Sequence, residues 1–373
     1  MDQLLLGLTS ITLKQVVMYI IGGALIYLAI AKEYEPTLLL PIGFGAILVN
    51  IPFSSAIDQI AGGTVEHGAL SLLFNAGIVT ELFPLLIFLA VGAMIDFTPL
   101  LENPVMLFFG AAAQFGIFFT MSLSTLCGFS LKEAASIGII GAADGPTSIY
   151  VATRFAKNLL GPISVAAYSY MSLVPLIQPP VIKALTTHKE RCIKMEYQPE
   201  GVSKIVKILF PIIVTFIAGI VAPSSVSLIG FLMFGNLIRE CGVLNSLSKT
   251  AQNELANIVT ILLGITIGST MTADKFLQPQ TLLILGIGLL AFVFDTAGGV
   301  IFVKTLNIFL KKKINPMIGA AGISAFPMSA RVIHKMGQKE DPSNFLLMHA
   351  VGANVAGQIG SVIAGGLILA LIK

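Results

Sequence analysis

The chain has 373 residues, of which 55% are hydrophobic and 11% are charged, and its formal net charge is +3. Soluble domains typically carry about 25% charged residues, and a soluble protein this apolar would expose large hydrophobic patches. The composition therefore excludes an ordinary soluble domain, and the small net charge gives no indication of nucleic-acid binding. A bilayer accommodates this composition, because helices satisfy their own backbone groups and apolar side chains can face lipid.

Apolar segments long enough to cross a membrane, roughly 20 residues each, occur along the whole chain. We expect full spans at 15–32, 36–52, 80–96, 104–128, 159–182, 205–223, 255–272, 281–303 and 344–372. Segments interrupted by Gly, Pro or polar residues, and so short or re-entrant, are expected at 68–79, 134–156, 225–238 and 314–331. The predicted fold is an all-α polytopic membrane protein with about nine to eleven transmembrane helices.

One hydrophilic internal segment, 186–204, divides the chain near its middle. It is rich in Lys and Arg, as is the cluster 311–313, so the positive-inside rule places both in the cytoplasm. A solvated loop with no role beyond topology is the alternative for the individual lysines. Cys127, Cys192 and Cys241 show no CxxC spacing, so they predict neither a zinc site nor disulfides. Cys127 and Cys241 are expected to be small buried residues.

Two pairs of matching segments indicate an internal duplication. IGAA occurs at 140–143 and at 318–321, and VGAMIDF at 91–97 resembles IGSTMTADKF at 267–276, at nearly the same offset. Two inverted repeats whose broken helices meet at the bilayer midplane are typical of secondary transporters. Convergent Gly/Ala-rich helix packing is the alternative. We divide the chain into an N-terminal membrane segment (1–79), a first repeat (80–182), a central loop with linking spans (183–254) and a second repeat (255–373).

The first broken segment, Gly138–Phe155, places Asp144 in an apolar stretch, where a charged carboxylate costs about 2.5–3.5 kcal/mol on insertion scales. Pro146 lacks an N–H and clashes with the preceding turn, which frees backbone carbonyls. These carbonyls, the carboxylate and the hydroxyls of Thr147 and Ser148 predict an oxygen-rich site for a hard cation such as sodium. The alternative is that Asp144 only caps a helix at the membrane surface.

The second broken segment, Ile314–Lys335, repeats this pattern without the acid. Its glycines permit close backbone approach, its prolines interrupt the helix, and its hydroxyls offer oxygen ligands. The residues concerned are Asn315, Pro316, Gly319, Gly322, Ser324, Pro327 and Ser329. Arg331 follows, and its guanidinium either meets an anion or reaches from the interface to water.

Other polar residues in apolar surroundings are candidates of lower rank. Tyr168 and Tyr170 lie in one apolar run, and either phenol can relay a proton or bond a backbone carbonyl. Asn354 is expected to bond across helices. Asp295 and Glu81 belong either to a relay or to the ends of spans.

Four stretches carry a family resemblance: GAADGPTSIYVATRFA, VAAYSYMSLVPLIQPP, INPMIGAAGISAFPMSARV and NFLLMHAVGANVAGQIGS. They cover most of 134–182 and 314–365, and they resemble the beta subunit of the sodium-pumping biotin-dependent decarboxylases. That family couples decarboxylation of oxaloacetate, methylmalonyl-CoA, glutaconyl-CoA or malonate to sodium export. The resemblance implies a multi-pass protein of the prokaryotic inner membrane that acts as a translocase.

The resemblance also implies roles for single residues. Asp144 is similar to the family's sodium-binding aspartate. A second functional region of the family is matched by Asn315, Gly319, Ser324 and Arg331, and in it Ser324 contributes to a sodium site. Thr147, beside Asp144, joins the expected ion-binding set.

Tyr170 matches a tyrosine proposed to deliver a proton to carboxybiotin, and we assign recognition of the anionic carboxybiotin to Arg331. The resemblance implies that a partner carries the biotin, and the sequence agrees with this, since Lys194-Met195 here lacks a biotinyl-domain setting. The implied partners are a carboxyltransferase subunit, a biotin carrier protein and a small gamma-type membrane subunit, with several copies of this chain in the complex.

These assignments predict that the chain decarboxylates carboxybiotin and couples this reaction to sodium export and proton uptake. Two sodium ions around Asp144 and Ser324 would displace protons, leave on the outer side, and be replaced by a proton. A stand-alone sodium-coupled carboxylate carrier is the alternative, because repeats and an ion site fit it equally well.

Overall fold

The computed structural model describes residues 7–33, 36–61, 64–196 and 201–372. The described chain is built almost entirely from helices and has one short antiparallel hairpin, in which Gln59 pairs with Glu66. The elements of the first half are α2 (Leu13–Ala31), α3 (Pro36–Asn50), β1 (Gln59–Ala61), β2 (Thr64–Glu66), α4 (Ala69–Leu73), α5 (Leu82–Met94), α6 (Thr98–Glu102), α7 (Met106–Ala113), α8 (Phe115–Leu126), α9 (Leu131–Gly138), α10 (Gly145–Phe155) and α11 (Leu160–Leu185).

The second half follows a short helix, α12 (His188–Arg191), in the central hydrophilic segment. Its elements are α13 (Lys204–Val221), α14 (Val226–Glu240), α15 (Asn245–Thr250), α16 (Ala256–Ser269), α17 (Ala273–Phe276), α18 (Pro279–Phe309), α19 (Met317–Ala320), α20 (Met328–Glu340) and α21 (Leu347–Leu371). The all-α polytopic class predicted from the sequence is confirmed.

Within the described residues, 5 helices are long and apolar enough to cross a membrane, or up to 7 if each bent pair counts as one span. The bent pairs are Ala69–Val79 with Leu82–Met94, and Lys157–Met171 with Leu173–Leu185. The nine to eleven spans expected are not reached by this length criterion. The reason is that several apolar segments form shorter helices, such as α3 with 15 residues and α16 with 14.

The order of elements from α5 to α11 recurs from α16 to α21. Helices α5 and α16 have 13 and 14 residues, and each is followed by a very short helix, α6 or α17. A long helical segment, α7 to α9 in the first case and α18 in the second, then leads to a broken region and two further helices. The pairings correspond as well, since α3 packs along α16 while α14 packs along α5, and α11 packs along α18 while α21 packs along α7. This order agrees with the duplication indicated by the sequence, and the domain boundaries drawn from it remain a prediction.

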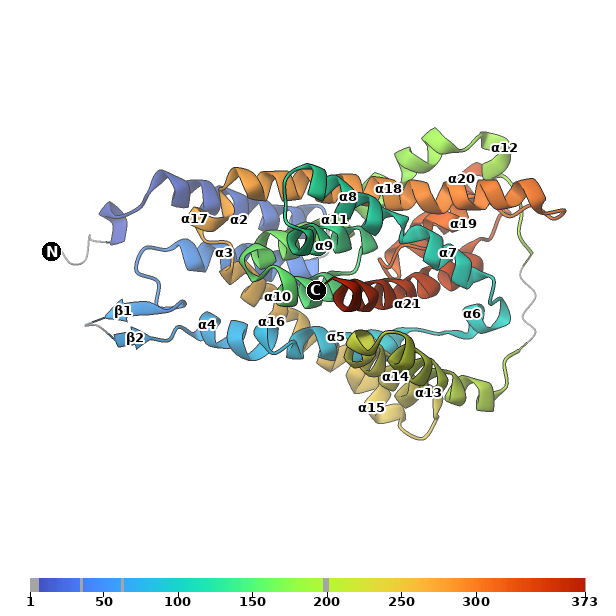
Figure 1. The fold of residues 1–373 in the computed structure, drawn as a ribbon, viewed down its shortest axis with the longest axis horizontal. Helices are drawn as coiled ribbons and strands as arrows, with labels where there is room; N and C mark the ends of the chain where they lie inside the picture. The colour runs from blue at the N-terminus through green and yellow to red at the C-terminus, as the bar shows by residue number, and fades with distance from the viewer. Residues whose placement is uncertain (1–6, 34–35, 62–63, 197–200, 373) are drawn as a thin grey trace.

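Most of the long helices run along the long axis of the molecule (Figure 1). The β1–β2 hairpin and α17 lie toward one end, and α12 and α20 lie toward the other. Cys127 lies just after α8 and is exposed, and Cys241 is only partly buried. Their expected burial was wrong, because both residues lie at the end of a helix rather than inside one.

Glycines allow α5 and α14 to approach until their backbones touch. A Cβ atom at Gly92 would lie 1.8 Å from the carbonyl oxygen of Leu232, and a Cβ atom at Gly235 would lie 2.0 Å from that of Leu89. Small residues at such positions are the usual means by which membrane helices pack closely, because lipid provides no hydrophobic drive between helices.

Alanine at either glycine of this contact should destabilise the protein. We expect Gly92→Ala or Gly235→Ala to lower the free energy of unfolding by about 1–3 kcal/mol, because the added methyl group meets backbone atoms that cannot move aside. Thermal unfolding of the purified protein in detergent would measure this effect. Gly286→Ala is the matched control, since no atom lies within 4 Å of a Cβ built there. Equal melting temperatures for all three variants would contradict the assigned packing.

Candidate functional site

The two broken segments predicted from the sequence contact each other in the core. In the first, a short 3₁₀ helix, Ile139–Ala142, ends at Ala143, whose left-handed φ of 56° turns the chain before α10 begins. In the second, the chain between α19 and α20 is non-helical around Ser324. The backbone N–H of Ser324 donates to the carbonyl of Ala142 at 3.1 Å, so each break supplies a partner to the other.

Asp144 caps the N-terminus of α10 and is only 4% exposed. The Thr147 hydroxyl donates to Asp144 Oδ2 at 2.7 Å, and the Thr147 backbone N–H donates to Oδ1 at 3.3 Å. The Ser361 hydroxyl, from α21 in the other half, donates to Oδ2 at 2.8 Å. Asp144 therefore does cap a helix, and it does so inside the protein core.

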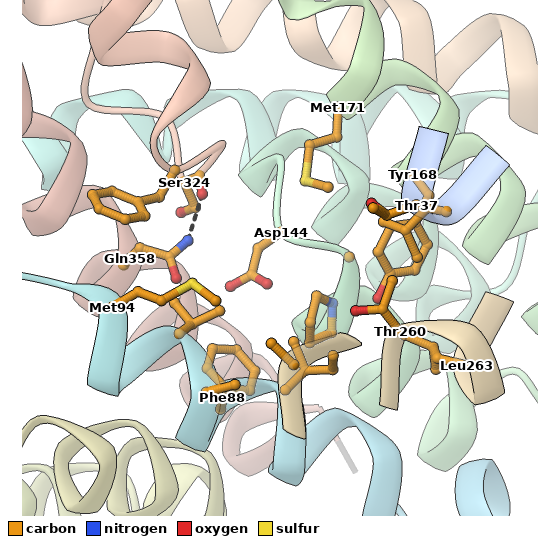
Figure 2. Close-up of a pocket in the computed structure, with 18 of the residues that line it drawn as sticks. Thr37, Phe88, Met94, Asp144, Tyr168, Met171, Thr260, Leu263, Ser324 and Gln358 are labelled. Atoms are coloured by element: carbon orange, nitrogen blue, oxygen red, sulfur yellow. Dashed lines mark hydrogen bonds between the residues drawn. The ribbon is translucent and has the colours of Figure 1, made fainter. Parts of the chain in front are cut away.

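Asp144 faces a cavity of about 250 Å³ between the broken segments and helices α3, α5 and α16. Figure 2 shows its carboxylate near the centre, with Ser324 and Gln358 on one side and Tyr168 and Thr260 on the other. Phe88, Met94 and Leu263 form much of the apolar wall. None of the described lining residues is Lys, Arg or His. A negative charge on Asp144 therefore has no basic partner within the lining.

The second broken segment contributes Ser324 to the same cavity and is held there by α21. The Ser324 hydroxyl donates to the carbonyl of Gly357 at 2.8 Å, and the Gln358 side-chain amide donates to the Ser324 carbonyl. Asn354 donates to the carbonyl of Ile323 at 2.5 Å, which is the interhelical bond expected for it. These contacts leave the side-chain carbonyl oxygen of Gln358 available at the cavity.

Asn315 and Gly319 do not line this cavity, although the sequence grouped them with Asp144. The Asn315 side chain is fully buried, and its amide donates to the carbonyls of Arg191 and Ile193 at 2.8 and 2.9 Å. Gly319 lies against the backbone of Gly299 in α18. In this structure Asn315 anchors the central loop and Gly319 permits helix packing.

The two tyrosines of α11 have separate surroundings. Tyr170, the residue chosen from the sequence, donates its hydroxyl to the carbonyl of Leu285 in α18 at 2.6 Å and is not among the cavity residues. Tyr168 does line the cavity, is 2% exposed, and has no hydrogen-bond partner for its hydroxyl among the described residues. Its ring packs on the backbone of Gly145, next to Asp144.

Arg331 lies in the first turn of α20 and is exposed. Glu81 lies at the bend before α5 and pairs with Arg154, with a Glu81 Oε1 to Arg154 Nε distance of 2.8 Å. Asp295 is fully buried in α18, and its Oδ1 accepts from the backbone N–H of Gly116 at 3.0 Å. Neither acid lines the cavity, so the structure separates both from Asp144.

Ser361 bonds to the Asp144 carboxylate and Gln358 lines the cavity, and neither residue was predicted from the sequence. Both lie on α21, with Asn354 four residues before Gln358. Residues spaced by three and four lie on one face of a helix, so Asn354, Gln358 and Ser361 form a polar stripe in an apolar span. This spacing could have predicted a buried polar face on the helix, but it did not indicate which broken segment that face would contact.

Comparison with known proteins identifies the family of the chain. The family described as Na+-transporting oxaloacetate decarboxylase beta subunit matches residues 14–372. The chain is 50% identical to the methylmalonyl-CoA decarboxylase subunit beta of Propionigenium modestum, over 98% of this chain and 96% of the relative. It is 52% identical to the glutaconyl-CoA decarboxylase subunit beta of Acidaminococcus fermentans, over 98% and 95%. It is 48% identical to the oxaloacetate decarboxylase beta chain of Haemophilus ducreyi, over 99% and 97%.

These matches run nearly end to end, and the apolar helices suit a multi-pass protein of the bacterial inner membrane. The resemblance seen in the sequence is confirmed, and the stand-alone carrier is not favoured. The chain belongs to the family of beta subunits of sodium-transporting carboxylic acid decarboxylases, and it is a membrane sodium-pump subunit of such a decarboxylase complex.

Proposed function

We propose that the cavity beside Asp144 is the sodium site of this pump and that sodium and a proton occupy it alternately. The observation that carries the proposal is a buried carboxylate beside a cavity whose described lining has no basic side chain. A buried charge is tolerated when it is paired. A cation that enters the cavity, or a proton, is then what neutralises Asp144, and the two compete for the same oxygen atoms.

The ligand set follows from the contacts around Asp144. Sodium is a hard cation and prefers oxygen ligands. Asp144, Thr147 and Ser361 form one connected group of oxygens, and the Ser324 hydroxyl and the Gln358 carbonyl lie at the same cavity. Asn315 and Gly319 support the site from a distance, through the central loop and through helix packing respectively.

Proton movement requires a donor that can reach the bound anion or Asp144. The Tyr168 hydroxyl lies at the cavity without a partner among the described residues, which suits a proton relay next to Asp144. Tyr170, whose role rests on the family resemblance, would have to exchange its bond to the Leu285 carbonyl before it could act. We keep Tyr170 as the proposed donor toward carboxybiotin and add Tyr168 as a relay candidate beside the ion.

Carboxybiotin is the proposed substrate, and its loss of CO₂ provides the driving reaction. Arg331 is the residue proposed to hold the carboxylate, because a guanidinium can donate two parallel hydrogen bonds to it. Its exposure on α20 suits access by a bulky partner. From Ser329 near the break, α20 runs to Glu340, which pairs with Arg191 of the basic central segment. Arg331 therefore lies between the ion cavity and the face proposed to be cytoplasmic.

The partners proposed for this subunit are a carboxyltransferase subunit, a biotin carrier protein and a small gamma-type membrane subunit, in a complex with several copies of this chain. The relatives are named as beta subunits or beta chains of decarboxylases, which supports an assembly of several different chains. Biotin is assigned to a partner.

Asp144→Asn should abolish sodium-dependent decarboxylation and sodium transport, because the amide keeps the shape but cannot carry the negative charge that balances the cation. Ser361→Ala should keep the carboxylate but remove one of its hydrogen bonds, and should weaken the apparent sodium affinity by about 10–100-fold. The assay is radioactive sodium uptake into proteoliposomes containing the whole complex, with CO₂ release followed in parallel at varied sodium concentration.

Ser225→Ala is the control for these variants. Ser225 is also fully buried, but its hydroxyl donates to the Ala222 carbonyl and it does not line the cavity. Its sodium dependence should equal that of the unmodified complex. Unchanged sodium dependence in both Asp144→Asn and Ser361→Ala would rule out this cavity as the ion site.

Arg331→Ala should raise the apparent KM for the carboxylated biotin carrier by about 10–100-fold, the loss expected for hydrogen bonds to a charged group. Arg331→Lys should recover only part of this loss, because an ammonium lacks the planar paired donors. Steady-state decarboxylation at varied carrier concentration separates KM from kcat. An unchanged KM in both variants would mean that Arg331 only reaches from the interface to water.

A further inference from the structure

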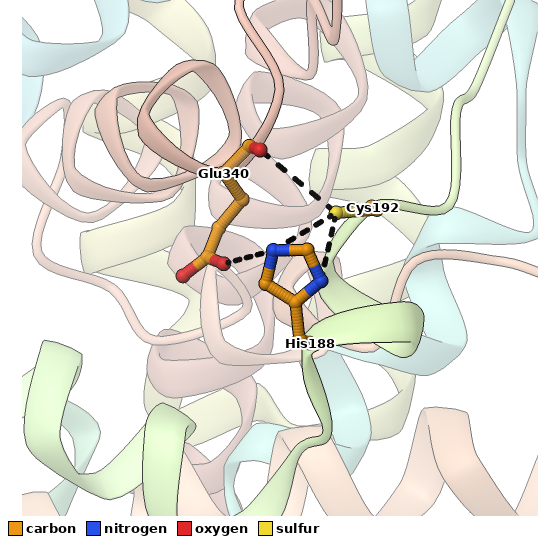
Figure 3. A group of neighbouring side chains, drawn as sticks. All are labelled: His188, Cys192 and Glu340. Atoms are coloured by element: carbon orange, nitrogen blue, oxygen red, sulfur yellow. Dashed lines mark hydrogen bonds and ion pairs between the residues drawn. The ribbon is translucent and has the colours of Figure 1, made fainter.

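The central hydrophilic segment brings three metal-ligating side chains together at the end of α20. His188 begins α12, Cys192 follows that helix by one residue, and Glu340 is the last residue of α20. Figure 3 shows the imidazole of His188 between the Cys192 sulfur and the Glu340 carboxylate. One ligand atom from each residue lies within 4.8 Å of the other two. The cysteine spacing did not predict this group, because Glu340 is far from His188 and Cys192 in the sequence.

The separations between these atoms suit one metal ion. His188 Nε2 lies 3.4 Å from Glu340 Oε2, and Cys192 Sγ lies 3.8 Å from His188 Nε2. A tetrahedral zinc ion with bonds of about 2.0–2.3 Å places its ligand atoms roughly 3.3–3.7 Å apart. Small side-chain movements would therefore bring all three atoms into coordination. Because His188 is 69% exposed, an ion can reach the group from solvent.

Neighbouring residues already hold the group in place. The Arg191 guanidinium donates from Nε to Glu340 Oε1 at 2.9 Å and from Nη2 to Oε2 at 3.5 Å, which orients the carboxylate with Oε2 on the side of His188. Thr187 and Glu190 form a reciprocal cap that fixes the first turn of α12. Supporting hydrogen bonds of this kind usually orient metal ligands in proteins.

The charges also suit a divalent cation. The Glu340 carboxylate pairs with the Arg191 guanidinium, with Arg191 Nε 2.9 Å from Glu340 Oε1, and supplies one negative charge. Cys192 is a free cysteine, and on the face proposed to be cytoplasmic its thiol would stay reduced. As a thiolate, Cys192 would bring the ligand charge to −2, which matches zinc, and the imidazole and thiolate favour zinc over magnesium or calcium.

We propose that His188 Nε2, Cys192 Sγ and Glu340 Oε2 bind one zinc-class divalent transition-metal ion, with the fourth position left for water or a partner side chain. The ion would fasten the central loop, through α12 and Cys192, to α20 of the second repeat. Because α20 follows the Ser324 break and carries Arg331, the site would restrain the helix proposed to receive carboxybiotin.

The test uses the purified full-length protein in detergent without a histidine tag, titrated with zinc alone by calorimetry. We expect one equivalent to bind. His188→Ala and Cys192→Ser should each weaken zinc binding by at least about 10–100-fold. That is the usual loss when a residue that only hydrogen-bonds to a metal ligand is removed, and these two residues would bind the metal directly. With cobalt as the probe, a thiolate-to-cobalt charge-transfer band should appear in the unmodified protein and be absent in Cys192→Ser.

Cys127→Ser is the matched control, because Cys127 is free and exposed, lies beyond the end of α8, and should leave the affinity and the cobalt band unchanged. Thermal unfolding without metal checks that each variant is folded. The proposal is overturned if the unmodified protein binds no stoichiometric zinc, or if folded His188→Ala and Cys192→Ser variants bind it as tightly as the unmodified protein.

Discussion

The whole arrangement depends on one constraint, namely that a helix broken inside a bilayer exposes backbone groups that have no water to bond. In this chain the polar side chains of the apolar helices satisfy those groups. Ser148 donates to the carbonyl of Ile139, and Ser329, in the other half, donates to that of Ala320, each nine residues back. Gln178 also bonds the Ala320 carbonyl. Much of the polarity of the two broken segments and the helices around them is therefore explained by the breaks themselves.

Asp144 is the exception, because capping α10 does not require a charged residue. A neutral Ser or Asn would cap α10 as well as an aspartate does. Other acids in the structure have cationic partners, such as Glu81 with Arg154, Glu340 with Arg191 and Glu190 with Lys304. Asp295 is buried and has no such partner among the described residues, but it does not line the cavity. Among the acids that the structure describes, Asp144 alone combines burial with an adjoining cavity.

The sequence predicted the features that depend on local chemistry and failed on those that depend on contacts between the halves. The helix break at Pro146, the hydroxyl of Thr147 and the burial of Asp144 follow from neighbouring residues, and the structure has them. The bond from Ser361 to Asp144 joins residues 217 positions apart, and no local pattern specifies it. The same holds for Asn315, whose amide reaches the central loop. Tyr168 and Tyr170 point to different sides of one helix, so the sequence could not tell which one lies at the cavity beside Asp144.

The position of the cavity also bears on how an ion could change sides. One wall comes from α3, α5 and α16, and α5 is packed against α14 through the backbone contacts at Gly92 and Gly235. These helices offer mainly apolar surface to Asp144, whereas its hydrogen-bond partners come from α10 and α21. A polar group that bonds only to its own side can move past an apolar wall without breaking hydrogen bonds across it. We propose on this basis that the broken segments and α21 would move together past α3, α5, α14 and α16, a motion that would have to open the pair between Arg154 of α10 and Glu81 at the start of α5.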